Sequence, residues 1–189
     1  MITCEICGAE LAKPARGRVP RFCGTRCRVA AHRKQDQFYV PGELKDLPRW
    51  ILHKDKRPMA LGGYWLSIND RSKWATYEKA KESEHGDGVG FILNGDGVVC
   101  IDLDDCMEGG KPNQQARELI DSLPRTFVEV SPSGRGLHIW GYGEVTTGRR
   151  FERDGLKIEV YGEGRYLTVS GNALVKSKLA ELDLDDLVG

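Results

Sequence analysis

The 189-residue chain lacks any apolar run long enough to span a membrane. Cys4, Glu5 and Cys7 interrupt the N-terminal segment, where a secretory signal peptide would need an unbroken apolar core. These two absences predict a cytoplasmic protein with no membrane partner. Thiols stay reduced in that compartment, so the four of the six cysteines that cluster in paired spacings favour metal binding over disulfide bonds.

The chain also lacks a net charge, because 28 basic side chains balance 28 acidic ones. Residues 1–34 nevertheless contain eight Lys and Arg against Glu5 and Glu10, a net charge of +6, and the remaining residues have a net charge of −6. A basic segment joined to an acidic body is typical of an arm that grips a polyanion beside a metal-binding core. The alternative is that each set of charges only forms a solvated face.

Four of the cysteines are paired near the N-terminus. Cys4 and Cys7 have two residues between them, and Cys23 and Cys27 have three; a fifteen-residue basic loop separates the pairs. This spacing predicts one structural Zn²⁺ held tetrahedrally by four thiolates. A helix is expected from residue 26 to residue 37. His32, on that helix, is a rival fourth ligand that ranks below the cysteines.

The rest of the chain predicts an α+β domain with a mostly antiparallel sheet and few helices. We assign residues 1–36 to the zinc-binding module, 37–48 to a linker, 49–178 to the main domain and 179–189 to a C-terminal tail. Helices are expected at 74–83 and 113–123, and strands at 50–52, 89–93, 98–104, 127–130, 137–140, 156–161 and 166–169. The last six strands are expected to pair as three successive hairpins, the first of them around the Asn94–Gly97 turn.

Carboxylates interrupt two of these apolar strands. Because side chains alternate along a strand, Asp102 and Asp104 should project from one face, and Glu159 recurs on a later strand of similar texture. Three adjoining carboxylates offer the hard oxygen ligands that Mg²⁺ or Mn²⁺ prefers, which favours phosphoryl transfer. The alternative is that the aspartates only mark a strand end running into solvent and that Glu159 is an exposed neighbour of Lys157.

A turn rich in glycine and hydroxyl groups lies between the two acidic strands. Backbone amides, hydroxyls and a guanidinium there could bind a phosphate. Arg165 is a further candidate phosphate ligand. His138 is another, or it could instead donate a proton to pyrophosphate. The candidate residues in the turn are Ser131, Ser133, Gly134 and Arg135. A plain hairpin loop is the alternative. We expect Trp50, Trp65 and Trp74 to pack in the core or at its rim rather than to stack on bases.

The order of these motifs resembles the archaeo-eukaryotic primase superfamily, specifically the bifunctional primase-polymerase domain of phages and plasmids, here with an N-terminal zinc finger. The matching segments are Asp102-Leu103-Asp104, Ser131–His138, Ile158–Tyr161 and the following Gly164–Gly171. The resemblance implies a recognition-motif-like core that binds divalent metal and an NTP or dNTP on its open sheet. It implies Asp102, Asp104 and Glu159 as metal ligands, and Ser133, Arg135 and His138 as triphosphate ligands.

The leading hypothesis is therefore a DNA-templated nucleotidyltransferase, a primase or primase-polymerase of a phage or mobile element. Its partners would be a single-stranded DNA template and a replicative helicase acting in trans. Two alternatives remain open at this point. The same acids could position water in a metal-dependent nuclease, or the chain could be a non-catalytic zinc-finger protein that binds DNA during replication.

Overall fold

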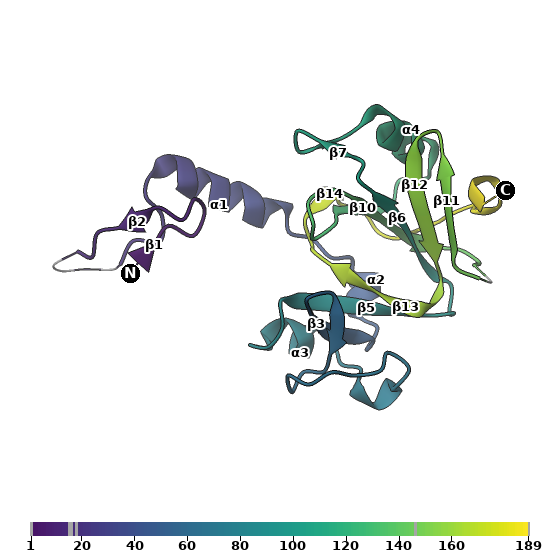
Figure 1. Cartoon of the computed structure of the whole chain (residues 1–189), viewed down its shortest axis with the longest axis horizontal. Coiled ribbons are helices and arrows are strands. Elements are labelled where there is room, and N and C mark those ends of the chain that lie inside the picture. The colour runs from purple at the N-terminus through teal and green to yellow at the C-terminus, as the bar shows by residue number, and fades with distance from the viewer. Residues whose placement is uncertain (1, 15–16, 18, 146, 189) are drawn as a thin grey trace. The chain divides into compact units, whose positions relative to one another are not determined.

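A computed structural model describes residues 2–14, 17, 19–145 and 147–188, without the side chains of 32–37, 186 and 188. The side chain of His32, the rival metal ligand, therefore lies outside the described residues. The chain divides into two compact units, Met1–Phe38 and Tyr39–Gly189 (Figure 1). In the described part of the chain, no helix combines the length and apolar character needed to cross a membrane.

The first unit is small. Strands β1 (Ile2–Thr3) and β2 (Glu10–Leu11) pair antiparallel, and helix α1 (Thr25–Gln37) follows. The helix begins one residue before the expected start. Arg21 makes a two-pronged ion pair with Glu5, at 2.7 and 2.8 Å, which links the two halves of the loop between them.

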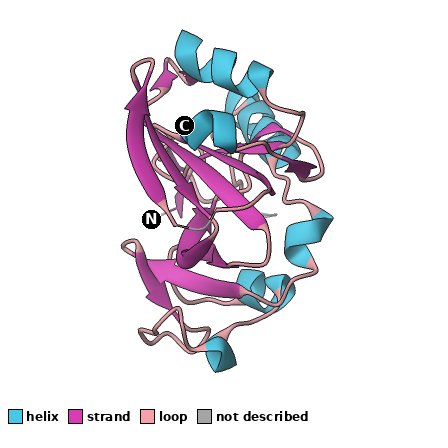
Figure 2. Ribbon diagram, turned by 90° about the vertical axis from the view of Figure 1, so that its right-hand side faces the viewer, coloured by secondary structure: helices cyan, strands magenta, loops and turns pink. Residues whose placement is uncertain are grey.

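The second unit contains two main sheets (Figure 2). The larger has the strand order β11-β12-β6-β10-β9-β14, with β15 added parallel to β10; the smaller has the order β13-β5-β3-β4. The strands of the larger sheet are β6 (Val98–Asp104), β9 (Phe127–Val130), β10 (Leu137–Tyr142), β11 (Arg149–Arg153), β12 (Leu156–Tyr161), β14 (Ala173–Val175) and β15 (Ala180–Glu181). Those of the smaller are β3 (Trp50–Lys54), β4 (Arg57–Met59), β5 (Gly88–Asn94) and β13 (Glu163–Val169).

Short elements complete this unit. They are α2 (Gly42–Lys45), the 3₁₀ turn η1 (Arg71–Lys73), α3 (Tyr77–Glu82), the ribbon β7 (Met107–Glu108) and β8 (Lys111–Pro112), α4 (Gln114–Ser122) and α5 (Asp185–Val188). Asn113 caps α4 by accepting a hydrogen bond from the amide of Ala116, at 2.9 Å. The α+β class with mostly antiparallel sheets and few helices is confirmed.

Two of the three expected hairpins were wrong. Strands β5 and β6 lie in different sheets, as do β12 and β13, and only β9 and β10 form the expected hairpin. The chain crosses between the sheets at both turns, which lie together because Gly95 N–H donates to Gly162 C=O at 2.9 Å. Strand β6 is paired on both edges by β10 and β12, so it has no edge left for β5.

The apolar side chains form two clusters, one on each face of the larger sheet. The first lies between the two sheets, where the ring of Phe91 contacts those of Trp50 and Trp140 at centroid distances of 5.1 and 5.8 Å. The second joins the opposite face, through Ile101 and Ile139, to α4 and the C-terminal segment. Trp50 is thus a core residue, as expected.

Both segments that flank the expected main domain pack onto it. Residues 39–48, which we had assigned to a linker, contribute Val40 and Leu44 to the first cluster, and Trp50 Nε1 donates to Leu44 C=O at 3.0 Å. The expected tail contributes Leu182 and Leu187 to the second cluster. Leucine side chains anchor both segments to the domain. The free energy gained when these side chains leave water exceeds the conformational entropy that the segments lose.

Leu44→Ala tests whether residues 39–48 belong to the folded unit. Leu44 is completely buried, so its truncation should lower the free energy of unfolding by about 2–5 kcal/mol. The matched control is Leu174→Ala, at an exposed leucine, which should change stability by no more than about 0.5 kcal/mol. Urea unfolding followed by tryptophan fluorescence measures both, and equal small changes would show that the segment is a linker after all.

Candidate functional site

A row of polar side chains crosses four neighbouring strands of the larger sheet. Asp102 on β6 is the register partner of both Glu159 on β12 and His138 on β10, and His138 is the partner of Glu129 on β9. Directly paired residues project from the same face, so these four, which we call the polar row, share one face. Asp104 follows two residues later on β6, on the same face.

The next row toward the smaller sheet is apolar. It consists of Tyr161, Cys100, Trp140 and Phe127, on the same four strands and all buried. These residues belong to the cluster between the two sheets. On this face of the sheet, residues two positions apart along the same strand thus belong to a packed core in one row and to a site rich in carboxylates in the next.

Glu129 and Asp102 lie on either side of the His138 ring. Glu129 Oε1 is 3.1 Å from His138 Nδ1, and Asp102 Oδ1 is 3.7 Å from His138 Nε2. His138 and Glu129 are buried, whereas the side chain of Asp102 keeps 21% of its surface exposed. The Nε2 edge of the imidazole is therefore the edge that faces the more open part of the row.

Glu129 is a residue of this row that the sequence analysis did not identify. Besides His138, its carboxylate accepts hydrogen bonds from Trp140 Nε1 at 3.3 Å and from Gly171 N–H at 2.7 Å, and it lies 3.0 Å from Ser170 Oγ. These partners explain how a carboxylate can be completely buried. The available signal was a lone acidic residue within the apolar strand Phe127–Val130.

The surroundings of His138 favour its protonated form. Burial by itself would lower the pKa of this imidazole, but the hydrogen bond and the charge of Glu129, with the charges of Asp102 and Asp104, outweigh burial and raise the pKa above its ordinary value. With Nδ1–H directed at Glu129, the ring can present a second N–H at Nε2. A cationic donor of this kind suits an anionic ligand.

The surroundings of Asp102 raise the pKa of its carboxyl group. Burial contributes most, the charges of Asp104 and Glu159 add to it, and the cations His138 and Lys56 oppose it. A carboxylate that is desolvated and repelled by two others would be stabilised by a bound cation, and the all-oxygen donor set is the one Mg²⁺ prefers. The three acids therefore fit a divalent ion by their chemistry. Among the described residues, however, only the cysteine cluster brings three or more ligand atoms within 4.8 Å of one another.

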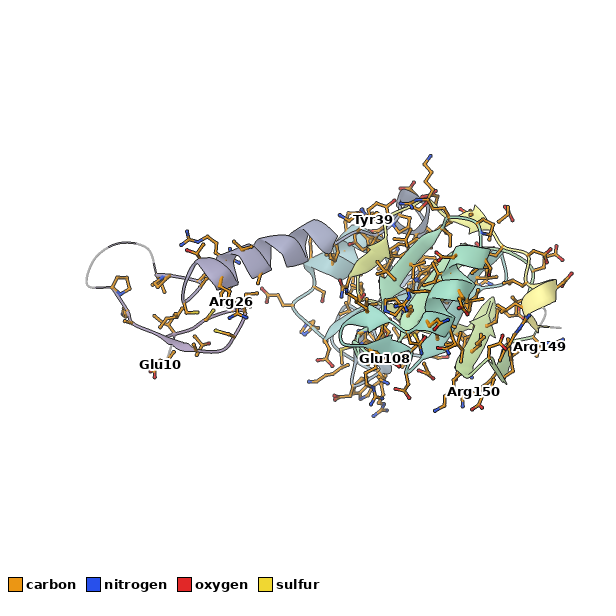
Figure 3. All side chains as sticks on the ribbon, turned by 90° about the horizontal axis from the view of Figure 1, so that it is seen from above. Glu10, Arg26, Tyr39, Glu108, Arg149 and Arg150 are labelled. Atoms are coloured by element: carbon orange, nitrogen blue, oxygen red, sulfur yellow. The ribbon has the colours of Figure 1, made fainter. Side chains whose placement is uncertain are left out.

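Glu159 has two protein partners that hold its oxygens. Its Oε1 is paired with Arg150 of the edge strand β11, a residue labelled in Figure 3, and Tyr161 Oη donates to its Oε2 at 2.5 Å. Arg165 lies over the ring of Tyr161, 5.0 Å from its centroid. Asp104, Glu159 and Arg150 also line a pocket of about 510 Å³. The pairing with Arg150 was not predicted, because only the register of β11 brings the two together.

The turn between β9 and β10 is held by its own hydroxyls. The hydroxyl oxygens of Ser131 and Ser133 lie 3.0 Å apart. Ser131 Oγ accepts a hydrogen bond from the amide of Gly136, and Ser133 Oγ accepts one from the amide of Arg135, each at 3.2 Å. Gly134 adopts the left-handed region, with φ of +73°. The exposed side chain of Arg135 pairs with Asp105, which follows β6, at 3.3 Å. The turn therefore lies beside the end of β6 at which Asp104 stands.

The four N-terminal cysteines come together in the first unit. Their sulfur atoms all lie within 4.8 Å of one another, with Cys23 Sγ 3.6 Å from Cys7 Sγ and 3.5 Å from Cys27 Sγ. Backbone amides of Cys7 and Ile6 lower the pKa of Cys4 to about 6, whereas hydrogen bonds with Cys23 and Cys7 raise the pKa of Cys27 to about 12, so the thiols of the cluster share their protons. The cluster could therefore hold one metal ion, and the predicted ligand set is the one that the structure assembles.

The structure thus brings Asp102, Glu159 and His138 into one row and places Asp104 next to it. Ser131, Ser133, Gly134 and Arg135 form the adjoining turn, and Arg165 reaches the row through Tyr161. The role that each of these residues plays remains a prediction.

Comparison with known proteins adds one relative. No family model matches the chain. A curated protein named DNA Primase-polymerase, from Nitratiruptor phage NrS-1, is 31% identical to it over 160 residues. The match covers 76% of this chain, and the chain spans about a fifth (22%) of the length of the phage protein. This similarity supports a relationship to the primase-polymerases.

Glu129→Gln tests the electrostatic role of the buried carboxylate. The substitution removes the negative charge but keeps its shape, so burial should then dominate and the pKa of His138 should fall below about 6.5. In the unsubstituted protein it should lie above that value. NMR titration of the histidine ring signals in chelator-treated protein measures both, with Glu118→Gln on α4 as an exposed control. An unchanged His138 titration in Glu129→Gln would show that the carboxylate does not govern the ring.

Proposed function

We propose that this chain is the catalytic core of a DNA-templated nucleotidyltransferase, a primase or primase-polymerase that makes or extends primers during phage or mobile-element replication. The observation that supports this most is the polar row, in which two carboxylates and a histidine from three separate motifs are direct register partners. The similarity to the phage DNA Primase-polymerase supports the same activity.

In this proposal Asp102, Asp104 and Glu159 hold Mg²⁺ or Mn²⁺. When bound, the ions would favour ionisation of the attacking 3′-hydroxyl and offset the charge that develops on the phosphates. Strands hold the three carboxylates more rigidly than loops would, which suits an in-line displacement. Glu159 would exchange its contact with Arg150 for the metal, and the freed guanidinium would then be available to a phosphate.

His138 and the β9–β10 turn would bind the triphosphate of the incoming NTP or dNTP. Glu129 fixes the imidazole through Nδ1, so that Nε2–H points toward the open part of the row and can donate to a phosphate oxygen. Ser131, Ser133, Gly134 and Arg135 would add hydroxyl, amide and guanidinium donors, and Arg165 another cation. A triphosphate site is what distinguishes this proposal from a nuclease, which needs only the metal and water.

We further propose that the cysteine cluster binds a structural Zn²⁺ and that its basic unit contacts the single-stranded DNA template or the primer. Four thiolates in this arrangement are the ligand set of structural zinc sites. A unit this small has little apolar core, so its fold should depend on the metal. A replicative helicase acting in trans is a further partner that the proposal includes.

Asp102→Asn tests the proposed chemistry. The amide keeps the shape of the side chain but removes the charge, so incorporation of labelled nucleotides should fall by at least ~100-fold with either Mg²⁺ or Mn²⁺. The assay uses unprimed and primed single-stranded DNA, with NTPs and dNTPs in separate reactions. The control is Asp121→Asn on the exposed face of α4, which should leave incorporation unchanged.

Each other outcome has a definite meaning. Incorporation near the normal rate in Asp102→Asn would contradict the proposed metal ligand. Metal-dependent shortening of DNA without nucleotides would favour the nuclease, and DNA binding without incorporation by the unsubstituted chain would favour the non-catalytic alternative. Products from primed DNA alone would restrict the activity to extension.

Removal of the zinc should affect the function of the first unit more than that of the second. Cys4→Ser combined with Cys7→Ser, or mild chelation, should weaken binding to single-stranded DNA and primer initiation more than extension of an annealed primer. Zinc content, measured by atomic emission, should fall from about one ion per chain. Equal loss of initiation and extension would instead make the cysteine unit part of the catalytic fold.

A further inference from the structure

A group of aromatic and basic side chains, all exposed except the half-buried Trp74, occupies the segment from β4 to α3. We call it the aromatic–cationic surface, and it consists of Arg57, Tyr64, Trp65, Arg71, Lys73 and Trp74. Tyr64 is 52% exposed and Trp65 is 47% exposed, the two highest values among the exposed large hydrophobic side chains that the structure describes. Trp65 therefore departs from the expected packing at the core or rim.

Each ring on this surface has a cation over it. The guanidinium of Arg57 lies 4.4 Å from the ring centroid of Trp65, that of Arg71 lies 5.5 Å from Trp74, and the ammonium of Lys73 lies 6.0 Å from Tyr64. Flat rings interleaved with positive charge are the combination that binds single-stranded nucleic acid, because bases stack on the rings and phosphates pair with the cations.

The charge of this segment is opposite to that of the unit around it. Residues 54–74 contain five Lys and Arg against Asp55 and Asp70, while the rest of residues 35–189 contain fifteen basic and twenty-four acidic side chains. Asp70 is engaged locally, because its carboxylate accepts hydrogen bonds from the amide and hydroxyl of Ser72. A local positive field on an acidic domain favours a polyanionic partner.

The segment is held in a fixed shape. Trp65 bridges to Met59 of the edge strand β4, and the amide of Ala60 donates to the carbonyl of Tyr64 at 2.8 Å. The amide of Leu66 donates in turn to the carbonyl of Pro58 at 3.3 Å. The two exposed rings thus lie on a tight loop beside a strand. Because this loop is already ordered, little conformational freedom is lost when a ligand stacks on the rings.

The surface also includes the turn between β3 and β4. Lys56, in this turn, comes directly before Arg57, and its carbonyl accepts a hydrogen bond from Tyr166 Oη at 2.5 Å. A strand bound along Arg57, Trp65 and Tyr64 would therefore also pass this turn.

We propose that the aromatic–cationic surface binds single-stranded DNA, the template of the proposed function, with bases stacked on Trp65 and Tyr64 and phosphates paired with Arg57 and Lys73. This inference rests on the proposed function for the identity of the strand. The surface itself is distinct from the cysteine unit and from the residues proposed to hold metal and triphosphate. A protein partner would need an acidic, flat epitope, and it becomes an outcome of the test.

The test is binding of a fluorescein-labelled oligo(dT) to the full zinc-loaded chain, measured by anisotropy without nucleotides or divalent metal. Trp65→Ala and Tyr64→Ala should each weaken binding by about 5- to 150-fold, whereas Trp65→Phe, which keeps a stacking ring, should restore most of the affinity. Leu174→Ala, which removes an exposed side chain elsewhere, is the matched control. Thermal unfolding confirms that each variant is folded.

Two further measurements distinguish the kind of contact. Arg57→Gln with Lys73→Gln should reduce the slope of log K against log salt by about 0.7 for each cation removed. Oligonucleotides that contain 5-iododeoxyuridine should cross-link to Trp65 or Tyr64 on irradiation. Unchanged affinity in both alanine variants, with adducts confined to residues 1–38, would overturn the inference and leave the surface to a protein partner.

The outcomes also separate this inference from the proposed function. Asp102→Asn should bind oligo(dT) normally and fail to incorporate nucleotides. Normal incorporation by Asp102→Asn, together with weak binding by Trp65→Ala, would contradict the catalytic proposal and keep the surface. Equal affinity for duplex and single-stranded DNA would overturn the stacking contact, because paired bases offer no free faces to the rings.

Discussion

A completely buried carboxylate is the constraint on which the rest of the site depends. The carboxylate of Glu129 has lost its contact with water, and hydrogen bonds with His138, Trp140, Ser170 and Gly171 replace it. Those partners come from β10 and from the segment after β13, so the same bonds that satisfy Glu129 also tie that segment to the larger sheet. The imidazole is fixed in turn, since its Nδ1 has one acceptor. The charge of Glu129 thereby sets the position of His138 and the protonation state that it favours.

The position of the site follows from how the two sheets are joined. The chain crosses between them at residues 94–97 and again at 161–163, and the hydrogen bond between Gly95 and Gly162 holds the crossings together. Near these crossings the sheets pack through aromatic residues such as Phe91 and Trp140. One pleat farther along the same strands the packing gives way to the polar row, so the carboxylates stand on the rigid strands of a packed core. This arrangement gives precision to side chains that repel one another, because the backbone that holds them cannot easily separate.

Alternation along the strands was enough to predict part of this site. It placed Asp102 and Asp104 on one face, identified Glu159 on a similar strand, and found the β9–β10 hairpin with His138 just after its turn. It could not predict the sheet crossings, because a hairpin and a corner between sheets use the same turn residues. Glu129 was missed because its partners lie up to 42 positions away in the sequence, and no local pattern distinguishes a buried acid from an exposed one. The clustering of the four cysteines was predictable from their spacing alone.

The ion pair between Arg150 and Glu159 shows how neighbouring carboxylates of the row can coexist. Arg150 is mostly exposed and Glu159 is nearly buried, so the guanidinium acts as a cation brought to the site from its solvent side. His138 does the same for Asp102 from the interior. Each acid of the row thus has a protein cation close to it, while burial above all, together with the charges of Asp104 and Glu159, still raises the pKa of Asp102. Removing the charge of Arg150 or of His138 would leave the repulsion between the carboxylates unopposed. The site would then be more strongly negative. In the proposed function, these cations would compete with the divalent ion for the same carboxylate oxygens.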